Sequence, residues 1–238
     1  IPFAHGGQAW QDATVFEAVA MGIGGNNYYK NCYVDLKESC LRSETTVKVF
    51  DQMRKLQSYT DEGSPGRDWN VATGMVIEGK AGFQIMGDWA KGEFTAAGKV
   101  PGVDYYCAPT PSNNGYLYNV DSFIFYKTSD PEKQEGQKLL AKLMMGKNFQ
   151  KVFNLYKGSI PARLDVPMDE FDKCAKTSNS DIKTAGASGG LVPSFAHGMA
   201  QGNTMKAALQ DVITEHFNSD MSSVDAANAL ADSVLDNM

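Results

Sequence analysis

The stretch Gly82-Phe83-Gln84-Ile85-Met86-Gly87-Asp88-Trp89-Ala90 joins a short apolar run to an acid and an indole through a glycine. Residues 82–86 are typical of a β-strand that ends at the glycine, so Asp88 and Trp89 are expected at the edge of a domain. This pair suits a sugar, because an indole offers a flat apolar face and a carboxylate accepts hydroxyl protons. The alternative is that Asp88 caps the next helix and Trp89 belongs to the core.

Helical and strand-like patterns alternate around this stretch. Two further strands are predicted at 105–108 and 122–126. Helices are predicted at 12–22, 43–56, 68–79, around Phe94, at 130–144, 149–155, 169–178, near Phe195, at 205–217 and at 224–235. Residues 22–27 are interpreted as a turn and residues 179–190 as a loop. Helices outnumber strands and alternate with them, so the predicted fold class is a helix-rich α/β domain.

Composition narrows the function classes. A chain of 238 residues with 42% hydrophobic content is long enough for a globular fold of one large or two modest domains. Its 28 acidic and 22 basic residues give a net charge of −6 without any run of Lys or Arg, so no nucleic-acid partner is expected. No apolar run approaches the roughly 20 residues that span a bilayer, so a soluble protein without membrane insertion is expected.

Sequence patterns for catalysis and for metal binding are absent. The chain has no G-x-S-x-G elbow, no H-E-x-x-H and no C-x-x-C. We therefore expect neither a metal nor an organic cofactor. Asp88 and Asp121, both predicted at strand ends, leave one enzymatic alternative open, a hydrolase that uses this carboxylate pair on a glycan.

Four more segments are unusual, and they follow a fixed order along the chain. They are 6–12 (GGQAWQD), 119–125 (NVDSFIF), 157–163 (KGSIPAR) and 192–198 (VPSFAHG). Together with 82–90 they resemble the glucose/mannose branch of the extracellular sugar-binding proteins of ABC importers, in the broad class of maltose-binding protein. The resemblance runs nearly from end to end of the chain.

The resemblance implies a periplasmic binding protein type 2 architecture. Members of that family are longer and begin with a βαβ lobe, whereas the first motif here already belongs to the second lobe. The chain is therefore expected to be the C-terminal portion of such a protein, lacking the N-terminal lobe. By the same likeness, 1–122 and 169–238 form the C-terminal lobe and 123–168 belong to the N-terminal lobe.

The resemblance also implies a ligand set. Trp10 and Trp89 would stack on the sugar, and Asp121, Lys157 and His197 would hydrogen-bond its hydroxyls. Weaker polar candidates are Gln8 and Asp88. The three hydrogen-bonding candidates each have a structural alternative: Asp121 as a strand-edge acid, Lys157 as a cation at a helix C-terminus, and His197 as a structural histidine.

The four cysteines permit two disulfides. Cys32 and Cys40 flank a short polar segment and could close a small loop, whereas Cys107 and Cys174 would tie a predicted strand to a distant helix. Both bridges would require an oxidising compartment such as the periplasm. Four free thiols are the alternative.

The predicted function is binding of a monosaccharide, glucose or a similar aldohexose, in a Gram-negative periplasm. By resemblance, two lobes would close on the sugar about a hinge and present it to the membrane permease subunits of an ABC transporter. Two alternatives stay open: the glycan hydrolase, and a protein-interaction module whose site residues are idle.

Overall fold

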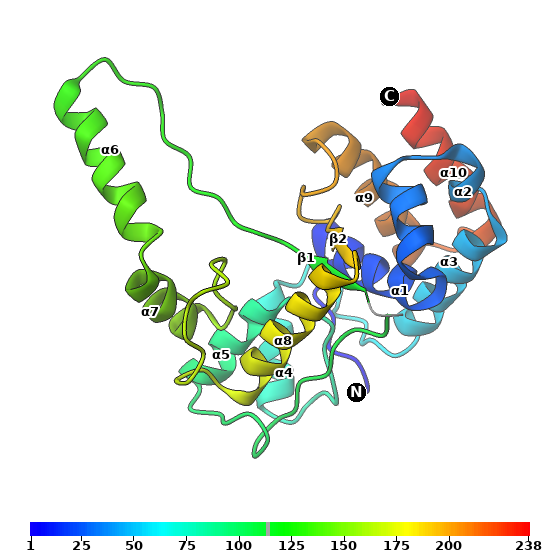
Figure 1. Ribbon diagram of the computed structural model, residues 1–238. Helices are drawn as coiled ribbons and strands as arrows, with labels where there is room; N and C mark the ends of the chain where they lie inside the picture. Colours follow the sequence, from blue (N-terminus) through cyan, green and yellow to red (C-terminus); the bar gives the residue numbers. More distant parts are fainter. Residues whose placement is uncertain (113–114) are drawn as a thin grey trace. The chain divides into compact units, whose positions relative to one another are not determined.

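The computed structural model of the protein describes residues 1–112 and 115–238, and helices account for most of its regular structure (Figure 1). This agrees with the helix-rich class predicted from the sequence. In chain order the elements are α1 (Ala9–Tyr29), η1 (Lys30–Val34), α2 (Glu38–Leu41), α3 (Glu44–Gln57), α4 (Trp69–Ile77), η2 (Asp88–Ala90), α5 (Lys91–Ala96), β1 (Tyr116–Tyr118), α6 (Pro131–Met144), α7 (Lys147–Lys157), α8 (Lys173–Ala187), β2 (Leu191–Pro193), α9 (Asn203–Asn218) and α10 (Ser223–Asp236).

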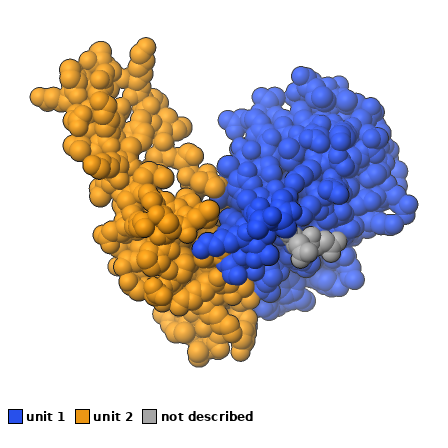
Figure 2. Space-filling view, in the orientation of Figure 1, with its two compact units in different colours: residues 1–87, 108–119, 180–238 blue, residues 88–107, 120–179 orange. Residues whose placement is uncertain are grey.

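The chain divides into two compact units (Figure 2). Unit 1 comprises residues 1–87, 108–119 and 180–238, and unit 2 comprises residues 88–107 and 120–179. These limits differ from the lobe limits expected by resemblance, which stay a prediction. Each unit is described by itself below.

Unit 1 is built around α1, α3, α9 and α10, which pack on one another (Figure 1). Their apolar side chains form one buried cluster that includes Phe16, Phe50, Leu209 and Leu230. The helix starts follow local sequence rules. At the N-cap of α3, for example, Ser43 Oγ accepts a hydrogen bond from the backbone N–H of Thr46.

A short parallel sheet in unit 1 comes directly before the turn that contains the predicted site residue His197. Strands β1 and β2 pair in parallel with Tyr118 opposite Pro193. The backbone N–H of Ser194 continues this pairing, donating to the carbonyl of Tyr118 at 3.0 Å. The turn that contains His197 comes directly after this pairing, so it starts from a strand end that hydrogen bonds hold in place.

Unit 2 contains η2, α5, α6, α7 and the first residues of α8. Its small core consists of Val166, Phe171 and Ala175. Helix α6 starts as its sequence predicts: Asp130 accepts from the backbone N–H groups of the first turn, and Pro131 is the first helical residue.

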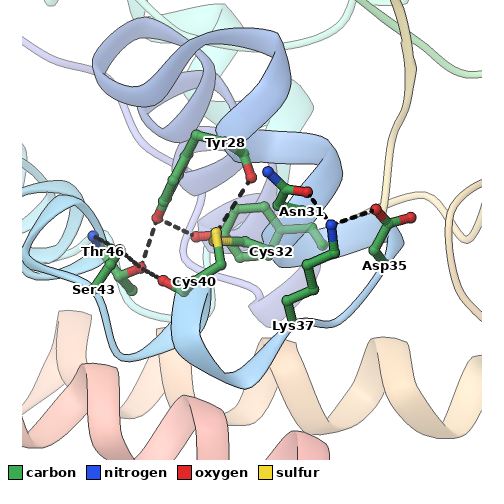
Figure 3. Close-up of a disulfide and its surroundings, with 9 residues drawn as sticks. Tyr28, Asn31, Cys32, Asp35, Lys37, Cys40, Ser43 and Thr46 are labelled. Carbon is green, nitrogen blue, oxygen red and sulfur yellow. Dashed lines mark hydrogen bonds and ion pairs between the residues drawn. A yellow bond between two sulfur atoms is a disulfide. The ribbon is translucent and has the colours of Figure 1, made fainter.

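Two disulfides confirm the pairing that the cysteine spacing permitted. Cys32 is bonded to Cys40 in unit 1, and Cys107 to Cys174 in unit 2. The first bridge joins η1 to α2, beside the hydrogen bond of 2.8 Å between Tyr28 Oη and Thr46 Oγ1 (Figure 3). Cys107 does not lie in a strand, so the second bridge ties an irregular segment to α8.

The disulfides give a direct test by mass spectrometry. We expect the folded protein, alkylated without reductant, to incorporate no label, and peptide mapping to recover the pairs Cys32–Cys40 and Cys107–Cys174. Four labelled cysteines would contradict both bridges.

Several sequence predictions of secondary structure are wrong. Residues 82–86, 105–108 and 122–126 are not strands: the first two contain only single bridges, Phe3 with Phe83 and Pro101 with Tyr105, and the third has no strand pairing among the described residues. A strand exists only where a neighbouring backbone completes its hydrogen bonds. An apolar, β-branched sequence cannot supply that neighbour.

The helix predictions need four corrections. Residues 179–187, interpreted as a loop, belong to α8, and the predicted helix near Phe195 is a turn. Helix α1 starts at Ala9 with Gln8 at its N-cap, three residues before the predicted start at residue 12. The chain is also helical through most of 22–27, with a break only at Gly25, where φ is 71°. Within the described part of the chain, no helix is both long and apolar enough to cross a bilayer.

Candidate functional site

The structure brings two predicted site residues together in unit 1. Trp10, in the first turn of α1, and His197, in the turn after β2, lie with their ring centroids 6.0 Å apart and their planes at 69°. Both side chains are half-buried. An indole and an imidazole therefore share one surface of unit 1, although 187 positions separate them in the sequence.

Gln8 and an acid extend this surface. The indole N–H of Trp10 donates to Gln8 Oε1 at 2.9 Å, and Gln8 Nε2 donates to Asp68 Oδ1 at 2.6 Å. Asp68 is an exposed residue at the N-cap position of α4. Sequence reasoning assigned Asp68 only to a helix start, because an acid before an apolar run is the ordinary mark of a cap.

A buried carboxylate lies beneath His197. Glu17 on α1 is 3% exposed and accepts hydrogen bonds from Tyr29 Oη at 3.0 Å and from the backbone N–H of Ala196 at 3.2 Å. Ser194 Oγ lies 2.7 Å from Glu17 Oε1 and 2.8 Å from His197 Nδ1. Burial, followed by the negative charge of Glu17, raises the pKa of Tyr29 well above its ordinary value.

Sequence reasoning missed Glu17 and Ser194. The available signal was an acid in the middle of the apolar run 13–21, since a buried charge requires several partners. This signal could not identify Ser194 as a partner, because Ser194 lies 177 positions from Glu17 in the sequence.

In unit 2, Asp88 and Trp89 form the short helical turn η2. Asp88 Oδ2 accepts from the backbone N–H of Ile160 at 3.1 Å. Burial raises the pKa of the Asp88 carboxyl, and hydrogen bonds from Ser159 and Ile160 together with the charges of Lys91 and Lys157 oppose that rise. Asp88 thus connects η2 to the segment after α7 instead of capping a long helix.

Asp121 and Lys157 form an ion pair in unit 2. Lys157 is in the last turn of α7, before Gly158, and its Nζ lies 5.8 Å from the ring centroid of Phe153. The Asp121 side chain is 61% exposed. Residues 122–126, which directly follow Asp121, do not form a strand, so the predicted strand end is not what positions its carboxylate.

The predicted residues thus fall into two sets. Unit 1 holds Gln8, Trp10 and His197, and unit 2 holds Asp88, Trp89, Asp121 and Lys157. The first set offers an indole, an amide and an imidazole, and the second an indole, two carboxylates and an ammonium group. The indoles can stack on an apolar ring face, and the polar groups of both sets can exchange hydrogen bonds with hydroxyls. Among residues 1–112 and 115–238, no three His, Cys, Asp or Glu side chains are grouped to hold a metal.

Comparison with known proteins places the chain in a family. The sequence model for "Bacterial extracellular solute-binding protein" matches residues 3–212. Two relatives named "Probable sugar-binding periplasmic protein" are similar: that of Brucella suis biovar 1 is 47% identical over 98% of this chain and 55% of its own length. That of Rhizobium meliloti is 45% identical over 98% of this chain and 56% of its own length.

The fold agrees with this likeness. A solved "Chitin oligosaccharide binding protein" superposes with a TM-score of 0.74 at 16% identity, covering 99% of this chain and 60% of that structure. The chain spans about half the length of the curated relatives that it matches. The extent of the family match and the identity to these relatives show that the chain belongs to the bacterial extracellular solute-binding proteins.

Proposed function

We propose that the chain is part of a periplasmic receptor that binds a monosaccharide, glucose or a similar aldohexose, and delivers it to the membrane permease of an ABC transporter. The pairing of Trp10 with His197, flanked by Gln8 and Asp68, carries the proposal. An aromatic face beside hydrogen-bonding groups is the arrangement that a pyranose requires. The names of the relatives from Brucella and Rhizobium support sugar as the ligand class.

Each unit contributes a different chemistry in this proposal. In unit 1, Trp10 stacks on the sugar and His197 hydrogen-bonds a hydroxyl, with Gln8 as a further polar contact. In unit 2, Trp89 stacks, Asp121 accepts hydroxyl protons and Lys157 donates to an oxygen. The ion pair between Asp121 and Lys157 holds an acceptor and a donor side by side.

We also propose that the N-terminal lobe of a type 2 binding protein completes unit 2, with lobe limits at 1–122, 123–168 and 169–238. Apolar side chains of unit 2 support this: Phe123, Ile124 and Tyr126 are 60%, 79% and 81% exposed. Leu139, Leu140 and Leu143 on α6 are exposed as well. Several large apolar side chains exposed on one unit are the mark of an interface. The roughly half of the relatives' length that this chain does not span would provide the cover.

Replacement of Trp10 tests the sugar site. We expect Trp10→Ala to weaken glucose binding about tenfold, since loss of a stacked aromatic ring costs on the order of 1–2 kcal/mol. Trp10→Phe retains an aromatic face and is expected to keep most of the affinity. Isothermal titration of both variants with glucose measures the difference, and equal affinities for Trp10→Ala and the unmodified protein would contradict the assignment.

A glycan hydrolase is the second candidate, and one observation favours it. A general acid needs a raised pKa, and burial raises that of Asp88. Against it, Asp88 is hydrogen-bonded to the backbone of Ile160, which occupies one carboxylate oxygen. Incubation with an aryl glycoside distinguishes the two: the receptor predicts no turnover, and turnover that Asp121→Asn abolishes would establish the enzyme.

A further inference from the structure

The side chain of Gln8 connects the first turn of α1 to the segment before α4. Its Oε1 accepts from the indole N–H of Trp10 at 2.9 Å and from Gln11 Nε2 at 3.0 Å, and its Nε2 donates to Asp68 Oδ1 at 2.6 Å. Gln11 Nε2 also donates to the carbonyl of Arg67 at 3.0 Å. Although Gln8 is the N-cap residue of α1, its side chain does not cap the helix. The amide serves these contacts instead.

The orientation of the Gln8 amide follows from its partners. An indole N–H only donates and an ionised carboxylate only accepts, so Oε1 must face Trp10 and Nε2 must face Asp68. The donors from Trp10 and Gln11 fill the two lone pairs of Oε1. Because the indole N–H is engaged in this way, Trp10 offers a ligand its ring and no hydrogen bond.

A close backbone contact brings Asp68 within reach of Gln8. The backbone N–H of Gly66 donates to the carbonyl of Gly7 at 3.0 Å. A Cβ at Gly7 would lie 2.3 Å from the carbonyl oxygen of Ser64, and a backbone atom cannot rotate away from it. The glycine directly before Gln8 is therefore a requirement of this approach.

We propose that Gln8 is a positioning residue whose amide, held by Asp68, fixes the orientation of the Trp10 ring on which the ligand stacks. An indole is not symmetric about χ2: a half-turn keeps the ring plane but moves the six-membered ring and the N–H to opposite sides. The hydrogen bond to Gln8 Oε1 selects one of these two orientations. The inference rests on the proposed sugar-binding function and specifies that the ligand presents an apolar ring face to Trp10.

Gln8 then acts on the ligand mainly through Trp10. Its Oε1 has no lone pair left, and one hydrogen of Nε2 is directed to Asp68. The second hydrogen of Nε2 is what the side chain can offer to a ligand directly. This single donor is the smaller part of its role.

The indole N–H signals test the contact without a ligand. The chain has three tryptophans, and the signal that Trp10→Phe removes from the 1H–15N spectrum belongs to Trp10. Gln8→Leu fills similar space without an acceptor, and we expect it to accelerate solvent exchange of this N–H about fivefold, the value of one hydrogen bond. Equal exchange rates in Gln8→Leu and the unmodified protein would overturn the contact.

A second variant keeps the acceptor and so tests the cause. In Gln8→Glu combined with Asp68→Asn, one carboxylate oxygen accepts from the indole N–H of Trp10, and the other accepts from the amide introduced at position 68. We expect slow exchange of the Trp10 N–H to return. Fast exchange in this variant, at unchanged stability in urea, would overturn the proposal.

Gln84→Leu is the matched control. Gln84 is also a half-buried glutamine of unit 1 next to a tryptophan, but its amide donates to the backbone carbonyl of Trp69 at 3.1 Å and accepts from Thr73 Oγ1 at 2.8 Å. This variant is expected to leave the exchange rate of the Trp10 N–H in place. Faster exchange would show that loss of any such amide loosens unit 1, and the specific role of Gln8 would be wrong.

A double-mutant cycle with glucose separates positioning from direct contact. A phenyl ring is symmetric about χ2, so the Trp10→Phe background has no orientation to select. We expect Gln8→Leu to weaken glucose binding about fivefold in the unmodified protein and less than about twofold in Trp10→Phe. An equal loss in both backgrounds would show that Gln8 acts on the ligand directly, and no loss in either would show that ring orientation is irrelevant; each would overturn the proposal.

The two readouts also distinguish this proposal from the proposed function. If the unmodified protein binds no glucose while Gln8→Leu accelerates exchange of the Trp10 N–H as expected, the ligand is wrong and the hold of Gln8 on the indole stands. If glucose binds and the exchange rate does not change, the sugar site stands and the positioning role is wrong.

Discussion

Gly158→Ala is expected to lower the free energy of unfolding by about 3 kcal/mol. Gly158 ends α7 with φ at 90°, a left-handed conformation that costs other residues roughly 1–2 kcal/mol. A Cβ at this position would also lie 2.5 Å from the backbone nitrogen of Gly92 and 3.0 Å from the carbonyl carbon of Lys91. Backbone atoms cannot rotate away, so overpacking adds roughly 1–3 kcal/mol.

The chain offers a control that separates the two costs. Gly98 in the same unit also has a positive φ, 70°, but a Cβ there meets no atom within 4 Å. Gly98→Ala is therefore expected to lower the free energy of unfolding by only about 1 kcal/mol. Urea denaturation of both variants measures the difference. A Gly158→Ala variant no less stable than Gly98→Ala would show that α7 does not approach α5 as described.

The stability of the protein is expected to fall by about 3 kcal/mol between pH 6.5 and pH 4 through His216 alone. This side chain is fully buried on α9, with its ring centroid 4.8 Å from that of Phe50 and no hydrogen-bond partner for either ring nitrogen among the described residues. Burial, followed by the charge of Arg54, lowers the pKa of His216 from 6.5 to about 4, and Asp51 opposes this.

The sign follows from the lowered pKa. Above pH 6.5 the ring is neutral in both states, and the full contribution is present. As the pH falls toward 4, the unfolded chain binds a proton that the folded chain does not, and each pKa unit of difference contributes about 1.4 kcal/mol. His216→Phe keeps an aromatic ring and removes the titration. Denaturant unfolding from pH 7 to pH 4 should therefore show a shallower loss for the variant, whereas parallel curves would contradict the prediction.

Features fixed by neighbours in the sequence were predictable, and features fixed by distant partners were not. The predicted helices 43–56 and 130–144 begin at the N-caps Ser43 and Asp130, each of which acts on the turn that directly follows it. The apolar segment 122–126 reads as a strand but has no strand pairing among the described residues. Residues 179–187 are small and polar, and yet they continue α8. Local propensity there is weaker than the tendency of a formed helix to propagate.

The site divides in the same way. Trp10 and His197 were identified through motif resemblance, and the structure places their rings 6.0 Å apart. Asp68, Glu17 and Ser194 were missed. These residues can be recognised as part of the site only from contacts between residues far apart in the sequence, such as that of Gln8 with Asp68 over 60 positions. A single sequence contains no record of such pairs.

Calorimetric titration with glucose tests the central claim most directly. The chain is titrated alone and after addition of a separately produced N-terminal lobe, with circular dichroism to establish that each sample is folded. Binding heat with both pieces together, with an affinity that Trp10→Ala reduces about tenfold, is the result that a sugar receptor predicts. A folded sample that gives no heat with either preparation would contradict the claim that this chain contributes to a glucose site.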